Sequence, residues 1–259
     1  MEYVTAEQAR ASIRVKEFTG PTAGVAKGYT QANLAILKKE HAFDFLLFCQ
    51  RNEKQCPLID VLAAGSFTPS VAPTVDIRTD IPKYRIYKDG ILTDEVTDIM
   101  AYWEDDFVAF LIGCSFTFEA PLLEANIPIR HIEERCNVPM YKTNIACQKA
   151  GIFEGPTVVS MRPMKAADAI RAVQITSRFP AVHGAPIHIG DAAQIGITNI
   201  QQPDFGDAVT IHADEVPVFW ACGATPQAVA IESKPSIMIT HAPGHMFITD
   251  VRDETFSVL

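Results

Sequence analysis

Short apolar runs separated by Gly and Pro turns recur along the chain and predict buried strands. A strand covered on both faces is apolar at consecutive positions, whereas a half-exposed strand alternates. Tyr84–Thr93 is typical of a hairpin, because Asp89 and Gly90 suit the positive φ angles of a tight turn. The other expected strands are Phe107–Ile112, Ile127–Ile132, Thr157–Met161, Ile187–Ile189, Val216–Trp220, Ile237–Thr240 and Phe247–Thr249.

Helix-like spacing of apolar residues predicts several helices between these strands. Thr5 begins a capping-box sequence for a short amphipathic helix. Residues 31–51 indicate one or two helices, Thr97 can cap a helix that continues to Trp103, and Ala166–Arg178 is the clearest later helix. Together the pattern predicts an α/β fold, with a mixed β-sheet covered by helices on both faces and a smaller α+β lobe.

The segment from Gly65 to Pro82 is rich in Pro, Ser and Thr and is typical of a domain boundary or crossover. A chain of 259 residues has room for one large domain or two small ones. We expect a discontinuous main α/β domain of residues 1–75 and 180–259, and a second α+β lobe of residues 76–179.

Composition and charge exclude several classes of protein. The chain has 22 Lys and Arg against 31 Asp and Glu, and this net charge of −9 gives no support for binding nucleic acid. No apolar run reaches the ~18–20 residues that span a bilayer, and the start of the chain does not resemble a signal peptide. We therefore expect a cytoplasmic homo-oligomer with a small-molecule substrate, no nucleic-acid or membrane partner, and six free thiols.

Four apolar strands end in turns of small residues that carry reactive side chains. These turns lie within residues 111–119, 183–191, 218–226 and 239–247. In open α/β sheets ligands bind beyond the carboxyl ends of the strands, where such turns meet. The pattern therefore predicts a functional cleft built from these four segments.

The Cys and His residues of these turns allow more than one role. A Cys between small residues at a strand end is an activated thiolate or a packed thiol. The histidines suit general acid–base catalysis, a loop-borne metal site using His183, His188 or Asp191, or hydrogen bonds that orient a loop. No nucleotide-binding motif is present, and we expect no cofactor. The candidate catalytic residues are His183, His188, His241, His245, Cys114 and Cys222.

Arg130 and Arg162 stand within apolar segments, where an unpaired charge is costly. The partner of each is therefore an internal carboxylate or a carboxylate of the substrate, which Arg binds bidentately. The candidate substrate-binding residues are Arg130, Arg162, Ser115, Thr117, Glu119, Asn144, Gly223 and Thr225.

Blocks along nearly the whole chain resemble the D-glutamate cyclase family, whose bacterial members are called hydro-lyases. Proline is usual in the family near Lys38 and after Asp191, where this chain has Lys38 and Ala192. The resemblance implies a lyase that converts D-glutamate to 5-oxo-D-proline with loss of water. The blocks that carry it are 28–34, 44–52, 56–58, 113–119, 130–133, 143–144, 160–163, 179–180, 183–191, 217–223 and 240–245.

Cyclisation of glutamate needs a deprotonated amine, a neutralised side-chain carboxylate and a bent substrate. We expect Arg130 or Arg162 to clamp a carboxylate and His183 or His188 to take the amine proton. His241 or His245 would protonate the departing water. Backbone N–H groups at residues 113–115 and 222–223 would hold the oxyanion.

Three other functions are compatible with the same residues. Cys114 and Cys222 resemble, weakly, the paired thiols of cofactor-independent amino-acid racemases and epimerases. A non-catalytic protein that binds a small carboxylate is another alternative. A dehydratase of a related small carboxylic acid also agrees with the family resemblance.

Overall fold

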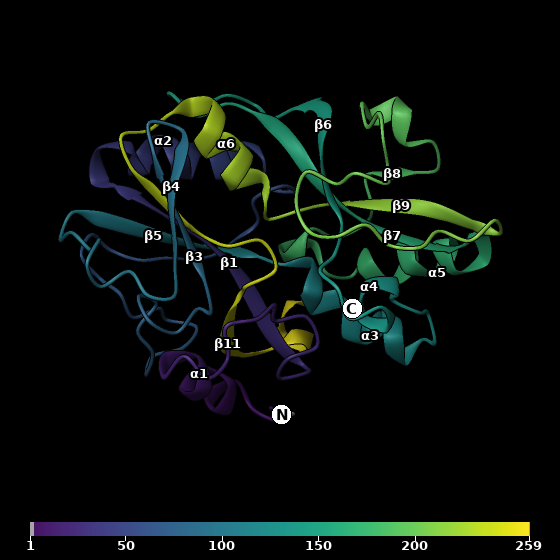
Figure 1. Cartoon of the computed structure of the whole chain (residues 1–259), viewed down its shortest axis with the longest axis horizontal. Coiled ribbons are helices and arrows are strands. Elements are labelled where there is room, and N and C mark those ends of the chain that lie inside the picture. Colours follow the sequence, from purple (N-terminus) through teal and green to yellow (C-terminus); the bar gives the residue numbers. More distant parts are fainter. Residues whose placement is uncertain (1–2, 259) are drawn as a thin grey trace.

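The computed structural model describes residues 3–258, which fold into strands and helices along the whole chain (Figure 1). The strands are β1 (Tyr29–Lys38), β2 (Leu58–Val61), β3 (Tyr84–Lys88), β4 (Ile91–Val96), β5 (Phe107–Gly113), β6 (Met140–Ala146), β7 (Pro156–Lys165), β8 (His188–Ile189), β9 (Glu215–Ala221), β10 (Met238–His241) and β11 (Phe247–Arg252). The α-helices are α1 (Ala6–Arg14), α2 (Lys39–Arg51), α3 (Glu119–Glu124), α4 (Arg130–Glu133), α5 (Ala166–Thr176) and α6 (Thr225–Ser233). Short 3₁₀ helices are η1 (Ser115–Phe118), η2 (Pro180–Val182), η3 (Ala192–Ile195) and η4 (Asp253–Phe256).

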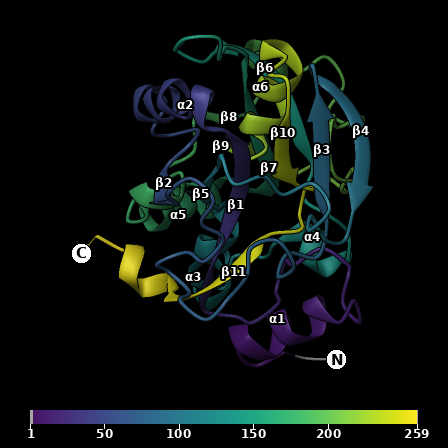
Figure 2. The ribbon, with the colours of Figure 1, turned by 90° about the vertical axis from the view of Figure 1, so that its left-hand side faces the viewer.

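Two antiparallel sheets organise these elements. The larger sheet has the strand order β2-β5-β1-β10-β3-β4, with β11 also paired to β1, and the smaller has the order β6-β7-β9-β8. Figure 1 shows the larger sheet on the left and the smaller sheet on the right. In Figure 2, α2 and α6 lie together at one end of the molecule and α1 lies at the opposite end. The predicted α/β class is confirmed, and the strands form two sheets.

β1 is the central strand of the larger sheet, and its side chains enter two cores. Leu34 and Ile36 pack against the segment that includes Leu62–Ile81, whereas Ala35 and Leu37 pack beneath α2 and α6. Because both faces are buried, the strand is apolar at consecutive positions. Its sequence therefore resembles that of a buried helix, and the prediction of helices over residues 31–51 is correct only from Lys39 onward.

The sheets divide the chain differently from the expected lobes. β3, β4 and β5 fall in the expected second lobe of residues 76–179 but pair within the larger sheet, and β8 and β9 join the smaller sheet. The register joins Leu34 of β1 to Leu111 of β5 and Ile239 of β10 to Ile86 of β3. Hydrophobic patterning decides which face of a strand is buried, but it does not say which distant strand is the neighbour.

Two further expected elements are wrong in type. Residues 97–103 form turns instead of a helix, and the apolar side chains of Tyr102 and Trp103 pack onto the core from those turns. Ile127 and Ile129 fill the core of the smaller sheet from a loop, and α4 follows them. Pro128 lies between the two isoleucines and lacks the N–H that a strand ladder needs.

The local predictions that rest on turn and cap chemistry are confirmed. The Thr5 side chain caps α1 in a capping box with Gln8. Asp89 and Gly90 have φ angles of 50° and 80° at the tip of the β3–β4 hairpin. Within residues 3–258 no helix is long and apolar enough to cross a membrane. The six cysteines are free thiols.

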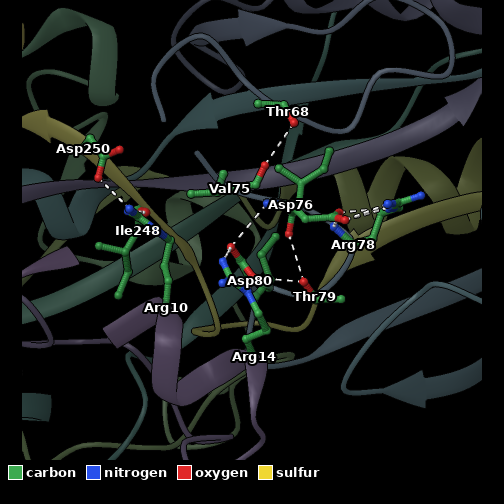
Figure 3. A network of polar contacts seen from close by, with 12 residues as sticks. Arg10, Arg14, Thr68, Val75, Asp76, Arg78, Thr79, Asp80, Ile248 and Asp250 are labelled. Carbon is green, nitrogen blue, oxygen red and sulfur yellow. Dashed lines mark hydrogen bonds and ion pairs between the residues drawn. The ribbon is translucent and has the colours of Figure 1, made fainter. Parts of the chain in front are cut away.

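The segment between β2 and β3 covers one face of the larger sheet and is held by an ionic network with α1 (Figure 3). Arg14 of α1 donates to Asp80 from Nε at 2.8 Å and from Nη2 at 2.5 Å. Arg78 pairs with Asp76 at 2.7 Å, and Arg10 pairs with Asp250 of β11 at 2.6 Å. These contacts fix a long Pro-, Ser- and Thr-rich segment that has little secondary structure of its own.

Candidate functional site

A fully buried arginine lies where the chain passes from one sheet to the other. Arg162 is on β7 and is 0% exposed. Its guanidinium carbon is 5.4 Å from the ring centres of both Phe118 and Trp220. Phe118 belongs to η1, which follows β5 of the larger sheet at once. A charge in these surroundings needs a partner of opposite charge, because a buried ion without one is strongly destabilising.

Glu119, the first residue of α3, is that partner. Arg162 donates to Oε1 of Glu119 from Nε at 3.0 Å and from Nη2 at 2.5 Å. Nε2 of His131, on α4, lies 3.1 Å from the same oxygen. Burial alone would raise the pKa of the Glu119 carboxyl, but His131 and Arg162 hold this pKa below its ordinary value. Glu119 is therefore a buried carboxylate that stays ionised.

Two serines complete the hydrogen bonds of the guanidinium. Arg162 donates from Nη1 to Oγ of Ser160 and from Nη2 to Oγ of Ser115, both at 3.1 Å. Ser160 precedes Arg162 by two positions on β7, so both side chains point to the same face of the sheet. Arg162 thus has the internal carboxylate partner that the sequence allowed, and its donors are largely used within the protein.

Cys114 and Cys222 occupy equivalent positions beside this cluster, each at a strand end before a helical segment. Both thiols belong to the same apolar cluster. Sγ of Cys114 accepts the N–H of Phe116 at 3.4 Å, and Sγ of Cys222 accepts the N–H of Ala224 at 3.5 Å. Burial raises the pKa of Cys114 well above its ordinary value and that of Cys222 to about 11. Both groups are therefore protonated thiols at neutral pH.

Gly223 is required because the turn after β9 lies directly against Asn33 of β1. A Cβ at this position would lie 1.9 Å from Nδ2 of Asn33 on β1. That amide is fixed, since it donates to the carbonyl oxygens of Gly113 at 2.6 Å and Ile112 at 3.2 Å. Any side chain at position 223 would push β1 away from the turn after β9.

A cavity of about 210 Å³ opens beside Glu119, and we name it the α3 cavity. Oε1 of Glu119 receives the contacts of Arg162 and His131, and no hydrogen bond within residues 3–258 uses Oε2. The cavity is smaller than the ~300–1,000 Å³ of drug-sized sites, so it suits a small metabolite. Its wall includes Gly28, Gln31, Phe116, Glu119, Leu123 and Asp253.

Of the predicted catalytic histidines, His183 and His241 are buried and His245 is partly buried. Nδ1 of His183 is 2.9 Å from the carbonyl oxygen of Lys54, and Nδ1 of His241 accepts the N–H of Leu34 at 3.1 Å in the middle of β1. Burial lowers the pKa of His183 and of His241 to about 4, so both are neutral near pH 7. His245 is partly buried, its Nδ1 is 2.9 Å from the carbonyl oxygen of Pro243, and burial lowers its pKa as well.

His188 does not join the Arg162 cluster. Its ring lies over Phe219, with 5.8 Å between ring centres, and Phe219 packs into the core on one face of the smaller sheet. Trp220, the next residue of β9, packs on the other face with Phe118. Because successive side chains of a strand point to opposite faces, His188 and Arg162 are on opposite sides of the sheet. The expectation that all four turns converge is therefore wrong for this part of the second segment.

The candidate metal ligands are separated in the same way. Asp191 caps η3 by accepting the N–H of Ala193 at 3.0 Å, and its carbonyl oxygen lies 2.8 Å from Nε2 of His188. His183 has its contact on the other side, with Lys54. In the described part of the chain, no group of three or more His, Cys, Asp or Glu side chains is placed to hold a metal ion.

Three predicted substrate-binding residues have other positions or structural partners, and a fourth is buried without a side-chain partner in the described part of the chain. Arg130 pairs with Glu215 of β9 outside the Arg162 cluster, and Asn144 is exposed on β6. Oγ1 of Thr225 donates to the carbonyl oxygen of Cys222 at 2.8 Å and so joins α6 to the turn before it. Thr117 is buried in η1, and its Oγ1 has no partner within residues 3–258.

The comparisons with known proteins identify the family. A model of the D-glutamate cyclase family matches residues 108–250. The protein of Bacillus subtilis strain 168 named "Putative hydro-lyase YcsI" is 65% identical over 251 residues, which cover 96% of this chain and 98% of that protein. The chain belongs to the D-glutamate cyclase family.

Further relatives and one solved structure extend the comparison. Proteins named "Putative hydro-lyase" from Bacillus pumilus and Stutzerimonas stutzeri are 67% and 63% identical, and the alignments cover 97% and 96% of this chain and 96% and 95% of theirs. A nitrogen repressor-like protein from Methanococcus jannaschii covers 93% of this chain and 97% of its own at 11% identity and a TM-score of 0.38, which is too low to support an argument.

The segment matched by the D-glutamate cyclase family model contains the buried ionic cluster but not the whole cavity wall. Glu119, His131 and Arg162 lie within residues 108–250, whereas Gln31 and Asp253 lie outside them. Sequence reasoning missed His131, Gln31 and Asp253 as site residues. His131 and Gln31 each lie in a family-like block (130–133 and 28–34), but nothing in the sequence marks Asp253, which reaches the cavity only through the fold.

Proposed function

We propose that this member of the D-glutamate cyclase family is a hydro-lyase that removes water from a small amino dicarboxylic acid, with D-glutamate closing to 5-oxo-D-proline as the specific reaction. One observation carries the proposal. Glu119 is a buried carboxylate that lines a cavity of metabolite size; Arg162 holds one of its oxygens, and no hydrogen bond within residues 3–258 uses the other. The names of the relatives support the same class of reaction.

The roles of the cluster follow from its hydrogen bonds. Arg162 does not clamp the substrate in this proposal, because Glu119, Ser115 and Ser160 already occupy its donors. It orients Glu119 and keeps the carboxylate ionised. His131, 3.1 Å from Glu119, is the proton carrier closest to the cluster, and histidine is well suited to that task near neutral pH.

Fewer backbone N–H groups are available to stabilise the oxyanion than the sequence suggested. The N–H of Gly113 donates to the carbonyl oxygen of Pro57 at 2.8 Å, and the N–H of Cys222 donates to that of Val158 at 2.9 Å. These two groups are engaged in the fold. The N–H groups of Cys114, Ser115 and Gly223 remain as the candidates for stabilising the tetrahedral intermediate.

Mass spectrometry of separate incubations with D-glutamate and L-glutamate tests the proposal. We expect loss of one water from D-glutamate only. Glu119→Gln should lower the rate by at least about 100-fold, the usual size of an acid–base or charge contribution. Glu17→Gln, at an exposed position, is the matched control and should keep the wild-type rate. No product from either enantiomer with folded wild-type protein would refute the substrate assignment.

The paired thiols favour one second candidate, a cofactor-independent amino-acid racemase. Cys114 and Cys222 lie in one cluster at equivalent turns, but burial raises the pKa of both, which opposes the thiolate that such an enzyme needs. Incubation in heavy water separates the two reactions. Cyclisation leaves the Cα hydrogen of glutamate in place, whereas racemisation exchanges it for deuterium.

A further inference from the structure

One wall of the α3 cavity carries a hydrogen-bond acceptor that has no donor. Gln31 is 4% exposed, and its Nε2 donates to the carbonyl oxygens of Thr22 at 2.9 Å and Val25 at 3.3 Å. These two bonds use both hydrogens of the amide and so fix its orientation. Oε1 is left without a partner in the described part of the chain. A buried acceptor without a donor is destabilising, so this oxygen indicates a place for a ligand.

Two carboxylates, Glu119 and Asp253, also line this cavity. Asp253, at the start of η4, is 5% exposed, and its Oδ1 accepts a hydrogen bond from Oγ1 of Thr30 at 3.1 Å. No hydrogen bond within residues 3–258 uses Oδ2 of Asp253 or Oε2 of Glu119. Gln31, Glu119 and Asp253 all line the cavity, and each has one acceptor oxygen that no hydrogen bond within residues 3–258 uses.

The apolar side chains in the rest of the cavity wall favour an organic ligand over an inorganic cation. Val25, Phe116, Leu123 and Ile132 supply apolar surface between the polar groups. A strongly hydrated inorganic cation gains little from such a wall, whereas an organic cation buries its carbon skeleton there. A primary ammonium group offers three N–H donors and no acceptor, which matches three free acceptor oxygens.

We propose that the α3 cavity binds the ammonium group of an amino-acid substrate through Gln31 Oε1, Glu119 Oε2 and Asp253 Oδ2. This inference rests on the proposed function, because it takes the cationic ligand to be the α-amino group of the molecule that is dehydrated. It assigns substrate binding to β1 and η4, which the family-model match does not include.

The site also supplies the proton transfer that ring closure needs. One N–H proton of the ammonium passes to Oδ2 of Asp253, and the neutral amine forms a bond to the side-chain carboxyl carbon. The carboxyl oxygen then departs as water with that proton and a second proton from the amine, so atoms and charge balance. Burial raises the pKa of Asp253 to about 7, so its carboxylate is a stronger base than that of an ordinary aspartate.

Several charged groups face Asp253 and act on its titration. Those that act on its pKa are Arg252, Glu254 and Glu124. Glu119 of α3 and Lys27 of the loop before β1 line the same cavity. Asp253 is ionised above pH 7 and neutral below it. Affinity for a cation should therefore rise as the pH passes upward through about 7 and then level off.

Binding of butylammonium and of butan-1-ol, measured by calorimetry at pH 6 and pH 8, tests the inference without any turnover. Butylammonium stays charged at both pH values. We expect it to bind about tenfold more tightly at pH 8 than at pH 6, as the titration of one neighbouring carboxylate requires. Asp253→Asn should abolish this pH dependence and weaken binding at pH 8 about tenfold, with no effect on butan-1-ol. Asp89→Asn, in the exposed β3–β4 turn, is the control and should behave as wild type.

Two results would overturn the inference. The first is equal affinity for butylammonium and butan-1-ol, or an unchanged affinity in folded Asp253→Asn. The second is butylammonium binding that is absent from the wild type and gained in Lys27→Met, since Lys27 of the rim would then fill the cavity with its own ammonium. The assay of 5-oxoproline formation is separate. Ammonium binding without product refutes the proposed function alone, and product without ammonium binding refutes this inference alone.

Discussion

Two of the arginine–carboxylate networks in this protein differ in how many carboxylate oxygens accept hydrogen bonds. In the network of Figure 3, Asp80 uses both oxygens: Oδ1 accepts from Arg14 and Thr79, and Oδ2 accepts from Arg14 and the N–H of Asp76. In the other network, Oε1 of Glu119 takes the hydrogen bonds of Arg162, and Oε2 takes none within residues 3–258. Both oxygens of Asp80 are therefore used in hydrogen bonds within the fold.

The difference shows why burial and pairing alone do not identify a functional site. Asp80 and Glu119 are both almost fully buried, and both are paired with an arginine. What separates them is unused hydrogen-bonding capacity beside an open space. A folded protein rarely leaves such groups unpaired, because each costs free energy, and their presence beside the α3 cavity points to a ligand.

Loss of Arg162 should have the largest effect. Arg162→Met leaves Glu119 buried without its counter-ion, so we expect the free energy of unfolding to fall by about 3–5 kcal/mol, with loss of activity. Urea unfolding followed by fluorescence of the two Trp residues measures this. The double variant Arg162→Met with Glu119→Gln should recover part of the stability and none of the activity. Full stability in the single variant would contradict the ionic role of Arg162.

Acid should lower the free energy of unfolding through two buried histidines, His183 and His241. Burial lowers the pKa of His183 and His241 from 6.5 to about 4, so the unfolded chain binds protons that the folded chain refuses. Their contribution is complete above pH 6.5 and is lost as the pH falls toward 4, by at most about 1.4 kcal/mol per pH unit for each histidine. His241→Gln, measured by urea unfolding at pH 7 and pH 5, should show a smaller loss than wild type. An equal loss would exclude His241 from this effect.

Loss of the Asp80 charge should have the smallest effect and leave function untouched. Asp80→Asn keeps a side chain of the same shape but weakens the contact to Arg14, which is half exposed. We expect a loss of about 1 kcal/mol in the free energy of unfolding and an unchanged rate of 5-oxoproline formation. A large loss of activity in a folded Asp80→Asn protein would erase the distinction between the two networks.

Local features of the fold could be predicted from the sequence, because the residues that cause them are adjacent in the chain. The capping box at Thr5, the hairpin turn at Asp89 and Gly90, and helix α5 depend on neighbouring residues. The start of the 31–51 segment could not be assigned correctly, since a strand buried on both faces and a buried helix are both apolar at consecutive positions.

Part of the candidate site can also be predicted from residues that are adjacent in the chain. The small residues at the strand ends predict the turns after β5 and β9, and the apolar residues around Arg162 mark it as a buried charge. The sequence could not choose between an internal partner and a substrate for Arg162, because Glu119 is distant along the chain. It also grouped His188 with the site, although strand alternation places His188 on the opposite face of the sheet.

The sequence by itself determined the α/β class, the family and the residue types able to carry acid–base chemistry, since these depend on composition, spacing and long similar blocks. Only the tertiary structure decided which of those residues meet. Pairing of β1 with β5 and β11 brings Gln31 and Asp253 to the cavity beside Glu119. Such long-range pairings arise when strands that are distant in the chain assemble into one sheet, and no local stretch of sequence encodes them.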